Sequence, residues 1–207
     1  MNGMVCCLVV GLVGLGQVFY NSRQPTRATE FTYQQPTLTA SRPLSASAEI
    51  HYAKSLRFNI YTFTVTAADS GRVRELLVKA YRGELLLTNF RIRVDGAVVG
   101  AEVADLDNNR FPELYVYSTS DGTGSFGRVY GWQFLPERKA DITSANWRIP
   151  ATNGYMGHDS LWVERDILCR KFPIYNSGDS NADPSGGYQM MRYKLQPVGS
   201  GFSLIAE

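Results

Sequence analysis

The chain has 207 residues and a formal net charge of +2, from 21 Lys and Arg against 19 Asp and Glu. Such a balance argues against the basic face that nucleic-acid binding needs and against a polybasic membrane-surface anchor. The apolar fraction of 44% is enough for a folded core. The chain has 12 Tyr and 10 Phe, which favour strands, and 19 Gly, which favour turns between them.

An apolar run from Met4 to Gly16 opens the chain. It is shorter than a membrane-spanning helix requires, and it is typical of the h-region of a signal peptide with a small-residue cleavage site at its end. Because no Lys or Arg precedes it, an uncleaved anchor and a misassigned start codon remain open. We expect residues 1–16 to be a signal peptide or membrane anchor and the protein to be periplasmic or secreted.

The next stretch, residues 17–54, is rich in Ser, Thr, Gln and Pro and predicts a flexible linker before a domain over residues 55–207. The cysteines are Cys6, Cys7 and Cys169. Removal of the first 16 residues leaves Cys169 alone, so we expect no internal disulfide and a packed thiol.

Alternation with a period of two predicts a half-buried strand over residues 56–66, and we prefer a strand over 72–81 because its neighbours are also strand-like. Asp95-Gly96 lies between the strands predicted at 85–94 and 97–103 and is a strong hairpin signal. Further strands are expected over 113–119, 128–134, 160–165, 167–175 and 188–195. No long amphipathic run indicates a helix. We therefore predict an all-β domain, an antiparallel β-sandwich of roughly ten short strands.

Oxygen-bearing side chains alternate at Asp105, Asp107 and Asn109, and Glu113 follows. Such donors suit a hard cation such as Ca²⁺. The spacing resembles the calcium loops of FG-GAP and VCBS repeats, although Arg110 stands where those loops have glycine. A solvated Asx turn between two strands is the other interpretation. A single copy argues against a propeller, which needs several blades.

Residues 120–127 (SDGTGSFG) join two well-predicted strands and should protrude as a loop. Its glycines allow positive φ and close approach to a partner. Thr123 and Ser125 offer small polar groups around one aromatic ring, Phe126, a composition suited to insertion into a polar cleft. A plain Gly-rich turn remains the alternative. The lack of a Lys-Ser/Thr pair opening a helix after the loop argues against a P-loop.

Nothing in the sequence forms a recognisable catalytic set. His158 beside Asp159 lacks a nucleophile, and a turn with a capped histidine is the simpler interpretation. Two histidines rule out a three-histidine zinc site. A third alternation of polar residues, over 179–183, is explained by turn chemistry, with cation binding as the minority interpretation. We therefore do not expect an enzyme.

Four segments together carry a family resemblance: residues 105–116 (DLDNNRFPELYV), 122–127 (GTGSFG), 154–159 (GYMGHD) and 170–195 (RKFPIYNSGDSNADPSGGYQMMRYKL). In this order they resemble the periplasmic inhibitors of invertebrate-type (I-type) lysozyme, the PliI family. The resemblance covers about residues 55–196 and excludes the leader and linker.

The resemblance implies an exported β-sandwich that blocks an I-type lysozyme and is not itself an enzyme. Family members insert a Ser-Gly-x-Tyr loop into the lysozyme's substrate cleft, and the matching positions here are Thr123, Gly124, Ser125 and Phe126. Phe126 lacks the tyrosine hydroxyl. We expect Arg128 to reach an acidic residue of the partner. No cofactor is expected beyond the Ca²⁺ considered above, and a homodimer is one option for the oligomeric state.

Overall fold

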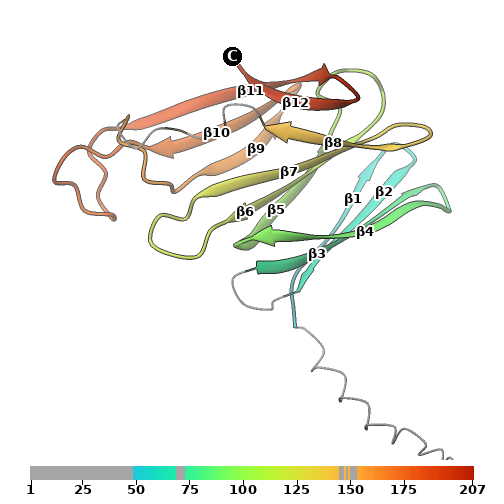
Figure 1. Ribbon diagram of the computed structural model, residues 1–207, viewed down its shortest axis with the longest axis horizontal. Helices are drawn as coiled ribbons and strands as arrows, with labels where there is room; N and C mark the ends of the chain where they lie inside the picture. Colours follow the sequence, from blue (N-terminus) through green and yellow to red (C-terminus); the bar gives the residue numbers. More distant parts are fainter. Residues whose placement is uncertain (1–48, 69–72, 145–146, 148, 150–152) are drawn as a thin grey trace, which may run out of the picture. The chain divides into compact units, whose positions relative to one another are not determined.

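The computed structural model describes residues 49–68, 73–144, 147, 149 and 153–207 (Figure 1). The predicted leader, Cys6, Cys7 and nearly all of the predicted linker lie outside these residues. The described part contains no helix that is long and apolar enough to cross a membrane.

Two sheets make up the described domain, which confirms the predicted all-β class. The first has the order β1-β2-β3-β4, with β1 (Ile50–Phe58), β2 (Tyr61–Ala68), β3 (Val73–Arg82) and β4 (Leu85–Asp95). The second has the order β5-β6-β7-β8-β12-β11-β10-β9, with β5 (Ala97–Ala104), β6 (Glu113–Thr119), β7 (Gly127–Phe134), β8 (Lys139–Ser144), β9 (Ser160–Glu164), β10 (Ile167–Pro173), β11 (Tyr188–Val198) and β12 (Gly201–Ala206). Paired strands are antiparallel except β8 and β12, which are parallel.

The start of the domain differs from the sequence prediction in two ways. Strand β1 begins at Ile50, inside the stretch assigned to the linker. The sequence did not reveal it because it is a mostly exposed edge strand without apolar alternation. The strand predicted over 56–66 is two strands that meet in a tight turn at Asn59 and Ile60, and Asn59 has φ 51°. Asparagine tolerates this left-handed conformation better than most residues, so the turn interrupts the period-two pattern without glycine.

Asp95-Gly96 does not close a hairpin, contrary to the prediction. It carries the chain from the first sheet to the second, so β4 and β5 are not paired. Val94 before the turn and Ala101 after it are both buried in the core between the sheets. Gly96 is required because its φ is +78° and a Cβ there would lie 1.9 Å from the carbonyl oxygen of Thr119. The apolar runs on each side therefore face each other across the core.

Strand β6 is buried on both of its faces and belongs to two cores. Leu114 and Val116 pack with Phe63 and other residues of the first sheet. Tyr115 and Tyr117 point the other way, into a second core with β10, β11 and β12. This double burial places β6 between the two cores of the domain.

Candidate functional site

The β6–β7 loop, Ser120–Phe126, is closed at its base and lies at the same end of the sheet as the β10–β11 loop, residues 174–187 (Figure 1). The backbone N–H of Ser120 donates to the carbonyl of Phe126 at 3.0 Å, and the N–H of Phe126 donates to Ser120 Oγ at 2.9 Å. These reciprocal bonds fix where the loop leaves and re-enters the sheet.

Two neighbouring segments hold the loop from the side. The N–H of His158 donates to the carbonyl of Gly124 at 2.6 Å, and the amide of Asn181 donates to the carbonyl of Thr123 at 2.6 Å. His158 Nε2 and Asn181 Oδ1 are themselves 3.2 Å apart. Three of the four segments that carried the resemblance are therefore joined here, although up to 58 residues separate the bonded positions.

Glycine makes this close approach feasible. Gly157 has φ +95°, and a Cβ at this position would lie 1.7 Å from the carbonyl oxygen of Gly124. A Cβ on Gly124 would in turn lie 2.4 Å from the ring of Phe126. A side chain at either position would push the loop away from its support.

The tip of the loop presents a mixed polar and aromatic surface. Thr123 is exposed, Gly124 and Ser125 are half-buried, and Phe126 is 43% exposed. The Phe126 ring packs edge-on against the Tyr155 ring, with centroids 5.6 Å apart. The aromatic side chain is thus held in place and still accessible, and it is not part of either core.

Arg128, also predicted to contact a partner, lies just after the loop. Its guanidinium is 2.8 Å from a carboxylate oxygen of Asp95, and both side chains are about half exposed. An exposed pair of this kind contributes about 0–1 kcal/mol. Arg128 can therefore exchange this partner for another carboxylate at little cost.

A buried ion pair supports the loop from below. Arg170 Nε lies 2.6 Å from Asp159 Oδ1, and the two side chains are 1% and 0% exposed. Asp159 Oδ2 accepts hydrogen bonds from the N–H of Gly127 at 2.6 Å and from the hydroxyl of Tyr155 at 2.5 Å. Burial and the neighbouring Asp159 raise the pKa of Tyr155. Asp159 is thus a structural anchor for the first residue of β7 and not the partner of His158 in a dyad.

Aromatic rings surround the Arg170 guanidinium. Its carbon lies 4.5 Å from the centroid of Trp147, 5.1 Å from that of Tyr155 and 5.3 Å from that of Phe172. A cavity of about 380 Å³ opens beside these groups, and Phe126 is part of its wall. The exposed loop therefore borders an aromatic recess that contains the Arg170 guanidinium, whose charge is paired with Asp159.

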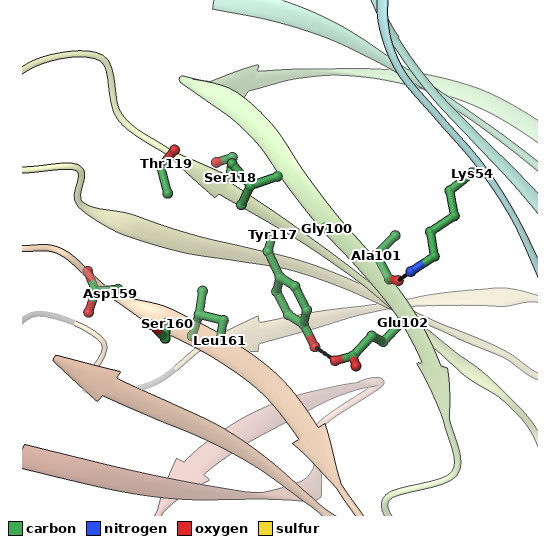
Figure 2. A pocket seen from close by; sticks show the side chains of 11 residues that line it. Lys54, Gly100, Ala101, Glu102, Tyr117, Ser118, Thr119, Asp159, Ser160 and Leu161 are labelled. Atoms are coloured by element: carbon green, nitrogen blue, oxygen red, sulfur yellow. Dashed lines mark hydrogen bonds between the residues drawn. The ribbon is translucent and has the colours of Figure 1, made fainter.

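A second cavity, of about 290 Å³, lies where the edge strands β5 and β9 of the eight-stranded sheet approach each other (Figure 2). Glu102 links the two edges, because one of its carboxylate oxygens accepts the hydroxyl of Tyr117 and the N–H of Val163, each at 2.7 Å. Burial and Glu102 raise the pKa of Tyr117. Lys54 from β1 donates to the carbonyl of Ala101 at 2.8 Å. The polar groups at this seam are occupied with joining strands.

At the other end of β6, the β5–β6 turn (residues 105–112) brings together three of the four predicted metal ligands. Asp105, Asp107 and Glu113 each offer an oxygen within 4.8 Å of the others. Asn109 completes the turn, since its amide donates to Asp107 Oδ2 and its oxygen accepts the N–H of Phe111. Burial, with Asp107 and Asp105 nearby, raises the pKa of Glu113 to about 8.

The third predicted alternation, over residues 179–183, forms a self-contained turn. Asp179 accepts the N–H groups of Asn176 and Ser185, both within 2.8 Å, and the Ser185 hydroxyl. These bonds lower the pKa of Asp179. Hydrogen bonds within a turn therefore account for this segment, in agreement with the main interpretation of the sequence. Cys169 is a free, buried thiol, as predicted.

The sequence analysis did not predict the roles of four residues that support the β6–β7 loop or the β5–β6 turn: Gln133, Tyr155, Arg170 and Asn181. Each has a hydrogen-bond partner at least 15 residues away that only the fold supplies. The counter-ion of Arg170, Asp159, is 11 residues away. A single signal was available, since Arg170 is a charged residue within an otherwise strand-like run and invites a search for a buried counter-ion.

The chain was compared with known proteins. No family model matches it, and no curated protein matches it significantly in sequence.

Proposed function

We propose that this protein is an exported inhibitor that occludes the substrate cleft of an I-type lysozyme with its β6–β7 loop. The observation that carries the proposal is the construction of that loop. Thr123 and Phe126 are exposed at its tip, while bonds from His158 and Asn181 hold its backbone. The proposed target acts on cell walls, so the proposal places the protein in the periplasm or outside the cell.

The rigidity of the loop supports binding. Ordering a flexible segment on association costs free energy that an already ordered loop does not lose. Here the base of the loop is closed by its own hydrogen bonds, and its side is held by two further segments. Inhibition then needs no residue that performs chemistry: it rests on steric occupation and on hydrogen bonds from Thr123 and the loop backbone.

Phe126 sets the expected strength of inhibition. In a cleft built to bond a tyrosine hydroxyl, phenylalanine leaves one buried polar group unpaired, which costs about 1–3 kcal/mol. Ser125 lies next to it and supplies a hydroxyl that can offset part of this loss. We therefore expect the wild-type chain to inhibit and Phe126→Tyr to inhibit about tenfold or more tightly.

A lysis assay tests the proposal. Purified protein is mixed with an I-type lysozyme, and the clearing of a cell-wall suspension is followed. Phe126→Ala should raise the inhibitory concentration at least about tenfold, because an aromatic anchor at the centre of an interface carries much of its energy. Leu85→Ala is the matched control: Leu85 is 65% exposed and is the first residue of β4, at the opposite end of that strand from Asp95, which pairs with Arg128 beside the loop. Undiminished lysis at micromolar protein would reject the function.

The alternative is a calcium-stabilised surface module for adhesion or glycan binding. The feature that bears on it is the carboxylate cluster of the β5–β6 turn. That cluster lies a whole strand away from the β6–β7 loop, about 20 Å for the seven residues of β6. A cation there is compatible with inhibition and identifies no glycan, so it does not favour adhesion.

A further inference from the structure

Exposed apolar side chains gather at one end of the first sheet. The β1–β2 and β3–β4 turns lie side by side there, because the N–H of Gly83 donates to the carbonyl of Ile60 at 2.7 Å (Figure 1). Ile60 is 54% exposed, Leu85 65% and Leu86 47%, and none of them belongs to either core of the described domain. We call these three residues the apolar turn patch. Large aliphatic side chains grouped in this way mark an interaction surface.

Basic side chains dominate the outer face of the same sheet. Buried residues of β2 alternate with half-buried threonines, which point away from the core. The register of β1, β3 and β4 places their charged residues beside these threonines, on the outer face. The charged residues of this face are Arg57, Glu75, Lys79, Arg91, Arg93 and Asp95.

Both carboxylates of the outer face are already paired. Glu75 lies 3.2 Å from Arg91, and Asp95 lies 2.8 Å from Arg128 of β7. The cations of this face that form no ion pair with a described carboxylate are Arg57, Lys79 and Arg93. The near-neutral charge of the whole chain hides this local excess, because it averages over both sheets. The outer face therefore attracts an anionic partner.

A lipid bilayer fits the apolar turn patch and the basic face better than a folded protein does. A stable protein interface buries about 800 Å² on each partner, far more than three side chains at adjoining turns provide. A bilayer needs no complementary shape, since aliphatic side chains enter the headgroup region while Lys and Arg contact anionic headgroups. The carboxylate cluster of the β5–β6 turn belongs to the second sheet, on the other side of the core, so it does not oppose this contact.

We propose that the first sheet docks on a lipid bilayer that contains anionic headgroups. The apolar turn patch enters the headgroup region, and the basic outer face contacts lipid phosphates. Leu85 and Asp95 are the two ends of the eleven-residue strand β4, about 33 Å apart. The β6–β7 loop lies near the Asp95 end, where Arg128 pairs with Asp95. Docking through the turn end therefore leaves that loop accessible.

Co-sedimentation of the full chain with lipid vesicles tests the proposal. Phosphatidylcholine vesicles are compared with vesicles in which about one third of the lipid is phosphatidylglycerol. We expect at least about tenfold tighter binding to the anionic vesicles, and we expect added salt to remove most of this difference. The apolar run of residues 4–16 carries no charge, so binding through it is common to both kinds of vesicle.

Two matched pairs of variants assign the effect to the first sheet. Ile60→Asp should weaken binding to anionic vesicles at least about tenfold. Val198→Asp adds the same charge to a side chain of similar exposure, 55%, in the second sheet and should bind within about twofold of the wild type. Arg93→Gln should weaken binding about fivefold, whereas Arg192→Gln, at an exposed position of β11, should not.

The proposal is overturned if the anionic vesicles bind no more tightly than the neutral ones, or if Ile60→Asp binds them as well as Val198→Asp. A loss in Arg93→Gln without one in Ile60→Asp would overturn it in favour of a soluble polyanion. A concentration-dependent dimer that Ile60→Asp abolishes would overturn it in favour of a second copy of the chain. Ile60→Asp should inhibit lysozyme like the wild type, so this proposal and the proposed function stand or fail separately.

Discussion

The buried pair of Asp159 and Arg170 allows a quantitative test of how the loop is supported. In Asp159→Asn, the guanidinium keeps its charge with 1% exposure and loses its counter-ion. The new amide also places a donor where the carboxylate accepted bonds from Gly127 and Tyr155. Breaking one side of a buried pair in this way costs about 3–5 kcal/mol.

The loss should be visible in denaturant and in heat. We expect the free energy of unfolding to fall by about 3–5 kcal/mol in urea titrations, and Tm to fall by about 6–20 °C. Asp166→Asn makes the same chemical change on the surface and should shift stability by less than about 0.5 kcal/mol.

A second variant separates the missing counter-ion from general damage. Arg170→Met added to Asp159→Asn removes both charges and keeps an apolar side chain among the rings of Trp147, Tyr155 and Phe172. The double variant should be more stable than Asp159→Asn alone, because no unpaired charge remains buried. A loss below about 1 kcal/mol in Asp159→Asn, or a double variant less stable than the single one, would refute this account of the pair.

Two further predictions concern the ends of β6. Gly157→Ala should displace the β6–β7 loop and weaken lysozyme inhibition, because its Cβ would lie 1.7 Å from the carbonyl oxygen of Gly124. Gly178→Ala shares the positive φ but meets no atom within 4 Å, so it should lose about 1–2 kcal/mol of stability and keep full inhibition; equal inhibition by both variants would contradict the proposed support. Glu113 should make stability fall with rising pH: burial and the nearby carboxylates raise its pKa from 4.5 to about 8 on folding, so its contribution is complete below about pH 4.5 and is lost by about pH 8. Each pKa unit corresponds to about 1.36 kcal/mol, which sets an upper limit of about 5 kcal/mol. Urea titrations from pH 5 to 8 measure this slope, and Glu113→Gln should flatten it; a wild-type slope of zero or of opposite sign would contradict it.

The sequence located individual strands well, including one that is buried on both faces. Strand β6 was placed at its observed bounds, residues 113–119, and β3 was correctly preferred to a helix. Alternation is a local signal, because successive side chains of a strand point to opposite faces. It does not report which strands are neighbours. Strands β8 and β12, which form the parallel pair, were not predicted at all.

Asp95-Gly96 shows why topology was harder to predict than strands. The pair is typical of a two-residue hairpin, and the flanking runs have the expected apolar character. What decides the outcome is the approach of Gly96 to Thr119, which no local pattern encodes. The same limit applies to the sites, where Gln133 meets Glu113 only through the pairing of β7 with β6.

The two ends of β6 are supported in the same way. At each end a carboxylate from one segment accepts bonds from another: Glu113 from Leu106 and Gln133, and Asp159 from Gly127 and Tyr155. The strand between them is buried on both faces, so it cannot shift without disturbing two cores. The carboxylate cluster at one end and the proposed binding loop at the other are therefore held on one rigid element. That element lets the loop be small: its position is set by the strand and its lateral bonds, and its own side chains are left free for a partner.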